Sequence, residues 1–187
     1  MRTIPLIIKC RLRRQKEVKM VQNLSQMDRL YQSMIEYFAG DPKRIQHFIK
    51  VNSFAGLIGR MESLPEEQLI ILEAAAYVHD IGIKPAESIY GECGGKYQEM
   101  LGPESAAAML KECGFSQEQI DRITWLVGHH HTYTNINGPD YQILVEADFL
   151  VNLYEDGLSE DAVRHAYEKI FRTESGKRIC RIMFGVS

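Results

Sequence analysis

The chain has 187 residues, of which 45% are hydrophobic and 25% are charged, a composition ordinary for a soluble globular domain with one buried core. Its longest apolar runs are far shorter than the roughly 20 residues that a transmembrane helix needs, so we expect no membrane association. The four cysteines are widely scattered, which fits reduced thiols in a cytoplasmic protein better than a disulfide framework or a cysteine zinc site.

Charge is distributed unevenly along the chain. Residues 1–20 carry a net charge of +6, whereas residues 21–187 carry a net charge of −9. A short basic arm can bind nucleic acid or an anionic membrane, but we favour an N-terminal extension, or a start codon assigned too early, with Met20 as the true start. The acidic body argues against nucleic acid as the main partner. We therefore expect one functional domain over residues 21–187.

Apolar residues recur at helical spacing nearly throughout the chain after Ser25, and no segment alternates apolar and polar residues as a strand would. Capping residues or prolines precede most of these segments. The expected helices cover residues 25–38, 42–61, 65–78, 105–113, 116–127 and 141–154, with a final amphipathic helix over residues 159–171. The helix that begins at Pro65 becomes apolar on all sides, which indicates a buried central helix. The predicted fold class is all-α.

Residues 83–101 interrupt the helical pattern with a proline and three glycines. We expect a long loop there, and long loops inside compact domains are usually functional. Its end, residues 96–99, would serve as a lid over a nearby site or as an ordinary connection.

The strongest chemical signal is His79-Asp80 at the end of the buried helix. Burying an ionised aspartate costs several kcal/mol unless the carboxylate is paired or binds a metal. Both side chains can converge on one ion in front of the helix end, and imidazole with carboxylate suits Mn, Fe, Co, Ni or Zn. Taken alone, the pair fits better a helix C-terminus at which Asp80 caps locally and His79 complements the helix dipole.

Two other segments favour a metal site over this helix-capping role. Glu146 and Asp148 lie in an apolar helical segment and point to different faces, so at least one of them should face the interior. His47 lies between apolar neighbours in a third helix. Because three polar sites on separate helices face the core, a shared metal ion is the most economical explanation.

Together, His47, His79-Asp80 and Asp148 resemble the signature of the HD-domain superfamily of metal-dependent phosphohydrolases. The resemblance covers roughly residues 25–155 and extends to the segments 74–82 and 146–148. It implies a single-domain helical bundle with the metal site between central helices, and usually phosphoester hydrolysis. It also implies one or two divalent ions, for which Mg is a further candidate, with the first ion bound by these four residues.

Three consecutive histidines, His129, His130 and His131, follow a predicted amphipathic helix. Dinuclear members of the superfamily bind a second ion through such histidines, which points to His129 and His130, although the helical register could equally favour His130 and His131. Those members also tend to carry a histidine where this chain has Leu101. We therefore expect one ion, with a second one as the alternative. A solvated cap at the helix end is the simplest alternative role for the three imidazoles.

The resemblance and the chemistry of the residues suggest roles in catalysis. The ion would polarise a phosphoryl oxygen and activate a water molecule, with Asp80 accepting or orienting its proton. His130 or Lys84 would protonate or stabilise the leaving group, and Arg44, Lys84 and His131 would bind the phosphate. Arg44 and Lys84 fit surface charges equally well.

Other mechanisms lack their motifs in this sequence. It contains neither a P-loop nor a Gly-x-Ser-x-Gly nucleophile elbow. The expected partner is a small phosphorylated substrate, by default a nucleotide or another metabolite, and the chain is a candidate homodimer. The competing functions are a diiron oxygenase of the same superfamily and a non-enzymatic, metal-bound regulatory module.

Overall fold

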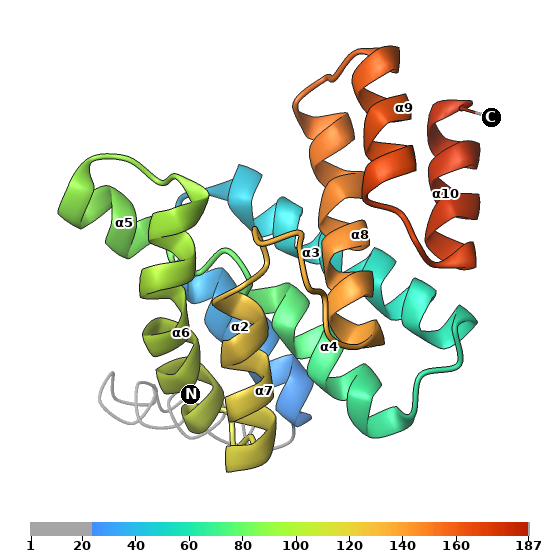
Figure 1. Cartoon of the computed structure of the whole chain (residues 1–187). Helices are drawn as coiled ribbons and strands as arrows, with labels where there is room; N and C mark the ends of the chain where they lie inside the picture. Colours follow the sequence, from blue (N-terminus) through green and yellow to red (C-terminus); the bar gives the residue numbers. More distant parts are fainter. Residues whose placement is uncertain (1–23, 187) are drawn as a thin grey trace, which may run out of the picture.

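The computed structural model describes residues 24–186, and the predicted basic extension of residues 1–20 lies outside this range. Within it the secondary structure is helical and no strand occurs, which confirms the all-α prediction (Figure 1). The helices are α2 (Gln26–Tyr37), α3 (Pro42–Met61), α4 (Glu66–Val78), α5 (Ile83–Tyr90), α6 (Gly95–Glu112), α7 (Gln117–Val127), α8 (Pro139–Glu155), α9 (Glu160–Lys169) and α10 (Glu174–Phe184). None of the helices in this range is both long and apolar enough to span a membrane.

Local capping explains where most helices begin. Ser25 and Ser116 each form a capping box, in which the serine hydroxyl accepts from a backbone N–H and the side chain three residues later accepts in return. Asp41 caps α3 immediately before Pro42, and Ser159 caps α9. These four helix starts agree with the sequence prediction.

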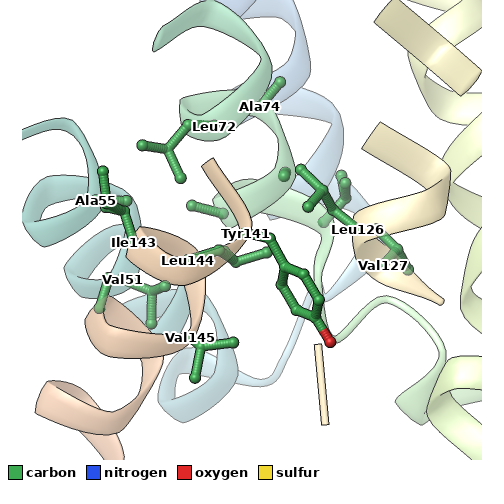
Figure 2. Close-up of a cluster of buried hydrophobic side chains, with 14 of the residues drawn as sticks. Val51, Ala55, Leu72, Ala74, Leu126, Val127, Tyr141, Ile143, Leu144 and Val145 are labelled. Carbon is green, nitrogen blue, oxygen red and sulfur yellow. The ribbon is translucent and has the colours of Figure 1, made fainter. Parts of the chain in front are cut away.

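Helices α3, α4 and α8 form the centre of the molecule. Each packs against the other two, α7 packs against α4, and α2 covers a further side of α4. Figure 2 shows buried side chains from four of these helices meeting in one core: Val51, Ala55, Leu72, Ala74, Leu126, Val127, Tyr141, Ile143, Leu144 and Val145. The predicted central burial of α4 is confirmed, and the three central helices carry His47, His79 and Asp148 on or directly after them.

The predicted loop over residues 83–101 is wrong. Helix α5 begins at Ile83, and α6 begins at Gly95, so only residues 91–94 connect them. Pro85 lies in the first turn of α5, where backbone N–H groups have no partner within the helix and a missing N–H costs little. Gly91 ends α5 in the left-handed conformation with φ of 72°.

The predicted helix over residues 105–113 also began too late. Helix α6 starts at Gly95 and continues through Pro103 to Glu112, although proline removes an N–H donor from a helix interior. Gly82 lets the turn after α4 approach α6 closely. A Cβ atom at Gly82 would lie 2.5 Å from the carbonyl oxygen of Gln98.

The helix predicted over residues 159–171 corresponds to α9 and is not the last helix that the structure describes. Helix α10 follows it, beside α9 and α8 at the upper right of Figure 1. Its start is fixed by the buried carboxylate of Glu146, which accepts from the backbone N–H groups of Arg172 and Thr173 at 2.6 and 2.9 Å. Glu146 and Asp148 are thus both buried, but Glu146 anchors the last helix.

Candidate metal centre

The structure brings the four predicted metal ligands together. His47 comes from α3, His79 and Asp80 directly follow α4, and Asp148 comes from α8. The Nε2 atoms of His47 and His79 are 3.2 Å apart, and Oδ1 of Asp148 lies 3.2 and 3.5 Å from them. Oδ2 of Asp80 lies 3.8 and 3.7 Å from the same two nitrogen atoms.

The second oxygen of Asp80 faces another pair of histidines. Oδ1 lies 3.0 Å from Nε2 of His130 and 3.8 Å from Nε2 of His131. Asp80 therefore joins two groups of side chains, each with spacing suited to a metal ion: His47, His79 and Asp80, and Asp80, His130 and His131. We call the first group, together with Asp148, the first cluster, and the other group the second cluster.

Hydrogen bonds fix which ring nitrogen the first-cluster histidines present. Nδ1 of His79 lies 3.0 Å from the carbonyl oxygen of Ala76, and Nδ1 of His47 lies 3.0 Å from a carboxylate oxygen of Glu155. Because carbonyl and carboxylate oxygens accept, both Nδ1 atoms carry the proton. The Nε2 lone pairs therefore face the cluster, which is the arrangement of histidines that bind metal.

The first cluster fits a divalent cation. Two Nε2 lone pairs at 3.2 Å, beside the buried carboxylate of Asp148, repel one another unless a cation or a proton lies between them. Burial alone would lower the pKa of His47, but its hydrogen bond to Asp148 and the charges of Asp148 and Asp80 raise the pKa to about 9. The partnering histidines in turn outweigh burial and hold the pKa of both aspartates well below the usual range. Imidazole and carboxylate are the donors that first-row divalent metals prefer.

Sequence reasoning missed two residues that hold these ligands in place. Glu155 accepts from His47 and pairs with Lys50, and Asn152 donates to Oδ1 of Asp148 at 2.9 Å. Both lie on α8 after Asp148, four and seven residues along, which places them on the same face of the helix. This helical spacing from Asp148 was the feature of the sequence that could have identified both residues.

In the second cluster, His131 is oriented differently. Its Nε2 lies 3.3 Å from the amide oxygen of Gln98, which accepts, and its Nδ1 lies 3.3 Å from the hydroxyl of Tyr133. Gln98 is held in this orientation because its amide nitrogen donates to the carbonyl of Cys93 at 2.8 Å. His131 therefore points an N–H toward Gln98 and Asp80, and its lone pair toward Tyr133.

The loop with the histidines is held at several points. Glu99 accepts from the backbone N–H of His131 at 2.9 Å and from the hydroxyl of Thr132 at 3.0 Å. The hydroxyl of Tyr141 donates to the carbonyl groups of His129 and Thr132. A Cβ atom at Gly95 would lie 2.7 Å from the ring of His131, so glycine there lets α6 begin directly against this imidazole.

His129 lies in neither cluster. Its Nδ1 donates to the carbonyl of Trp125 at 2.7 Å, and its ring stacks on Trp125 with a centroid distance of 4.1 Å. Of the two registers expected from the sequence, the structure brings His130 and His131, rather than His129 and His130, to Asp80.

The predicted phosphate-binding residues are engaged elsewhere. Lys84 donates to the carbonyl of Tyr37 and lies 5.1 Å from the centre of its ring. Arg44 pairs with Glu87 and with Asp41. Among the described contacts neither side chain reaches a cluster residue, so their role in substrate binding stays a prediction.

The comparisons with known proteins agree with this geometry. The family model for the HD domain matches residues 44–172, so the chain belongs to the HD domain family, which is one of metal-dependent hydrolases. Among solved structures, the fold is similar to that of a predicted HD superfamily hydrolase from an uncultured Thermotogales bacterium. The two chains are 21% identical, 90% of each is covered, and the TM-score is 0.63. Among curated proteins, none is similar enough to count as a match.

Proposed function

We propose that this HD-domain protein is a phosphohydrolase that cleaves a phosphate ester of a small substrate, by default a nucleotide or another phosphorylated metabolite. The observation that carries the proposal is the first cluster. In it, the donor atoms of two oriented imidazoles and two carboxylates, from three elements, lie close enough together to bind one metal ion. Membership of the HD domain family supports the hydrolytic chemistry.

The residues divide into metal ligands and groups that act on the substrate. His47, His79, Asp80 and Asp148 would hold the metal ion, which when bound polarises a phosphoryl oxygen and lowers the pKa of water. Asp80 presents one oxygen to this cluster and the other to His130, so it is placed to orient the attacking water.

His130 is placed to move a proton. Its Nδ1 donates to the carbonyl of Val127 at 2.7 Å, and Nε2 lies 3.0 Å from Oδ1 of Asp80. A proton on Nε2 makes this contact a charge-assisted hydrogen bond. We propose that His130 delivers this proton to the leaving oxygen, and that the Nε2–H of His131 binds the phosphate.

The orientation of His131 supports one metal ion rather than two. A second ion in the second cluster needs the Nε2 lone pair of His131, but Nε2 carries the proton that Gln98 accepts. The diiron oxygenase alternative needs two ions. Metal stoichiometry and an iron signal after anaerobic purification separate the two functions.

The proposal is tested with p-nitrophenyl phosphate, bis(p-nitrophenyl) phosphate and a panel of nucleotides, after chelation and after addition of Mn²⁺. We expect turnover that depends on the metal, and its loss in Asp80→Asn and His130→Gln. His129→Gln is the matched control, because that ring stacks on Trp125 outside both clusters. No turnover on the panel would favour a regulatory module, and unchanged metal binding and turnover in Asp80→Asn would refute the assignment.

A further inference from the structure

Tyr133 is a large, partly exposed side chain beside the second cluster. It lies on the loop between α7 and α8, and 42% of its surface is exposed. Its hydroxyl lies 3.3 Å from Nδ1 of His131, and its ring meets the ring of Phe149 edge to face at a centroid distance of 5.1 Å. Tyr133 is not one of the buried core residues, and Phe149, which its ring contacts, is only partly buried.

The contacts of Tyr133 connect it to both clusters. His131, which its hydroxyl contacts, faces Oδ1 of Asp80 at 3.8 Å, and Phe149 directly follows Asp148 on α8. A tyrosine hydroxyl can donate as well as accept, so the Tyr133 hydroxyl can also donate a hydrogen bond to a ligand.

The backbone just before Tyr133 is held in place by hydrogen bonds. Glu99 binds the backbone of His131 and the side chain of Thr132, and Tyr141 holds the carbonyl of Thr132. A donor held in place before the substrate arrives loses little conformational entropy on binding. This anchored backbone and the edge-to-face contact of the Tyr133 ring with Phe149 restrict where the hydroxyl can lie.

We propose that Tyr133 is a substrate-binding residue of this site, an inference that rests on the proposed phosphohydrolase function. Its hydroxyl donates to a non-bridging oxygen of the phosphoryl group and exchanges its bond to His131 for a stronger, charge-assisted one. Its ring and that of Phe149 form an apolar wall against the alcohol part of the ester. Phosphate oxygens only accept hydrogen bonds, and a tyrosine hydroxyl is a donor that suits them.

The hydroxyl is tested with Tyr133→Phe, which keeps the ring and its packing. Tyr167→Phe is the matched control, since it removes a hydroxyl on α9 that contacts only Arg181 among the described contacts. The measurements are kcat and KM for p-nitrophenyl phosphate, the inhibition constant of inorganic phosphate, and the affinity for Mn²⁺. We expect Tyr133→Phe to raise KM and the inhibition constant about tenfold, as for the loss of one hydrogen bond to a charged group. Its Mn²⁺ affinity and Tm should match those of the control.

The possible results distinguish this inference from the proposed function. If wild type turns over substrate and binds phosphate, but Tyr133→Phe equals the control, the inference is wrong. Weaker Mn²⁺ binding by Tyr133→Phe would instead show a positioning role through His131 and would also overturn it. If wild type neither turns over an ester nor binds phosphate, the proposed function itself fails. Tyr133→Leu tests the wall, because it should raise KM more for an aryl phosphate than for methyl phosphate.

Discussion

The partner of His47 offers a sharp test of how the first cluster is built. Glu155 accepts the Nδ1 proton of His47 at 3.0 Å, pairs with Lys50, and has only 11% of its side chain exposed. Its substitution by alanine removes the group that fixes the tautomer of His47. Loss of such a partner typically weakens metal binding about 10- to 100-fold, which corresponds to about 1.4–2.7 kcal/mol of binding free energy. Glu155→Gln should lose less, because an amide oxygen still accepts the proton.

The assay is competition for Zn²⁺ or Mn²⁺ against a chromogenic chelator at neutral pH. Glu160→Ala is the matched control, because it removes another glutamate paired with a basic residue, on exposed helix α9. The metal-free Tm of each variant shows whether folding is affected. Equal metal affinities of Glu155→Ala and Glu160→Ala would refute the reasoning that hydrogen bonding to Glu155 prepares His47 for the metal.

Three further predictions concern pH and stability. The pKa of His47 rises from 6.5 to about 9 on folding, so its protonation stabilises the metal-free protein fully below pH 6.5 and is lost as pH rises through about 9. The metal-free Tm should fall across that window in wild type and less in His47→Gln, while metal affinity rises as the competing proton leaves. Glu146→Ala leaves two backbone N–H groups without their acceptor, so chemical denaturation should show a loss of about 2–5 kcal/mol; a loss like that of a surface variant would contradict this. Gly176→Ala would place Cβ 2.0 Å from a carboxylate oxygen of Glu146 and should lower Tm, whereas Gly94→Ala, with open space around it, should not.

The fold was predictable where local chemistry sets the helix boundaries. Ser25, Ser116 and Ser159 each cap a helix through a side chain close in sequence. The prediction failed over residues 83–101, where proline and glycines were interpreted as loop formers. There the structure depends on tertiary packing, since Pro85 fits the unpaired first turn of α5 and Gly82 packs against α6.

The candidate site, like the fold, was predictable from the sequence only in part. The metal ligands were recognisable because a buried helix does not carry an aspartate without compensation. Glu155 escaped notice because its role depends on His47, 108 residues away. Tyr133 lies in a loop that has no periodicity to interpret. The choice among three consecutive histidines depends on the turn after Val127, whose geometry the sequence pattern does not define.

Elemental analysis of the purified protein tests the central claim most directly. Wild type and His129→Gln, loaded with Mn²⁺ or Zn²⁺ and freed of excess metal, should each retain about one divalent ion per chain. Asp148→Ala should retain almost none, because it removes the carboxylate that lies 3.2 and 3.5 Å from both histidine nitrogens. A wild-type chain that retains no metal, or an Asp148→Ala chain that retains as much as wild type, would contradict the account.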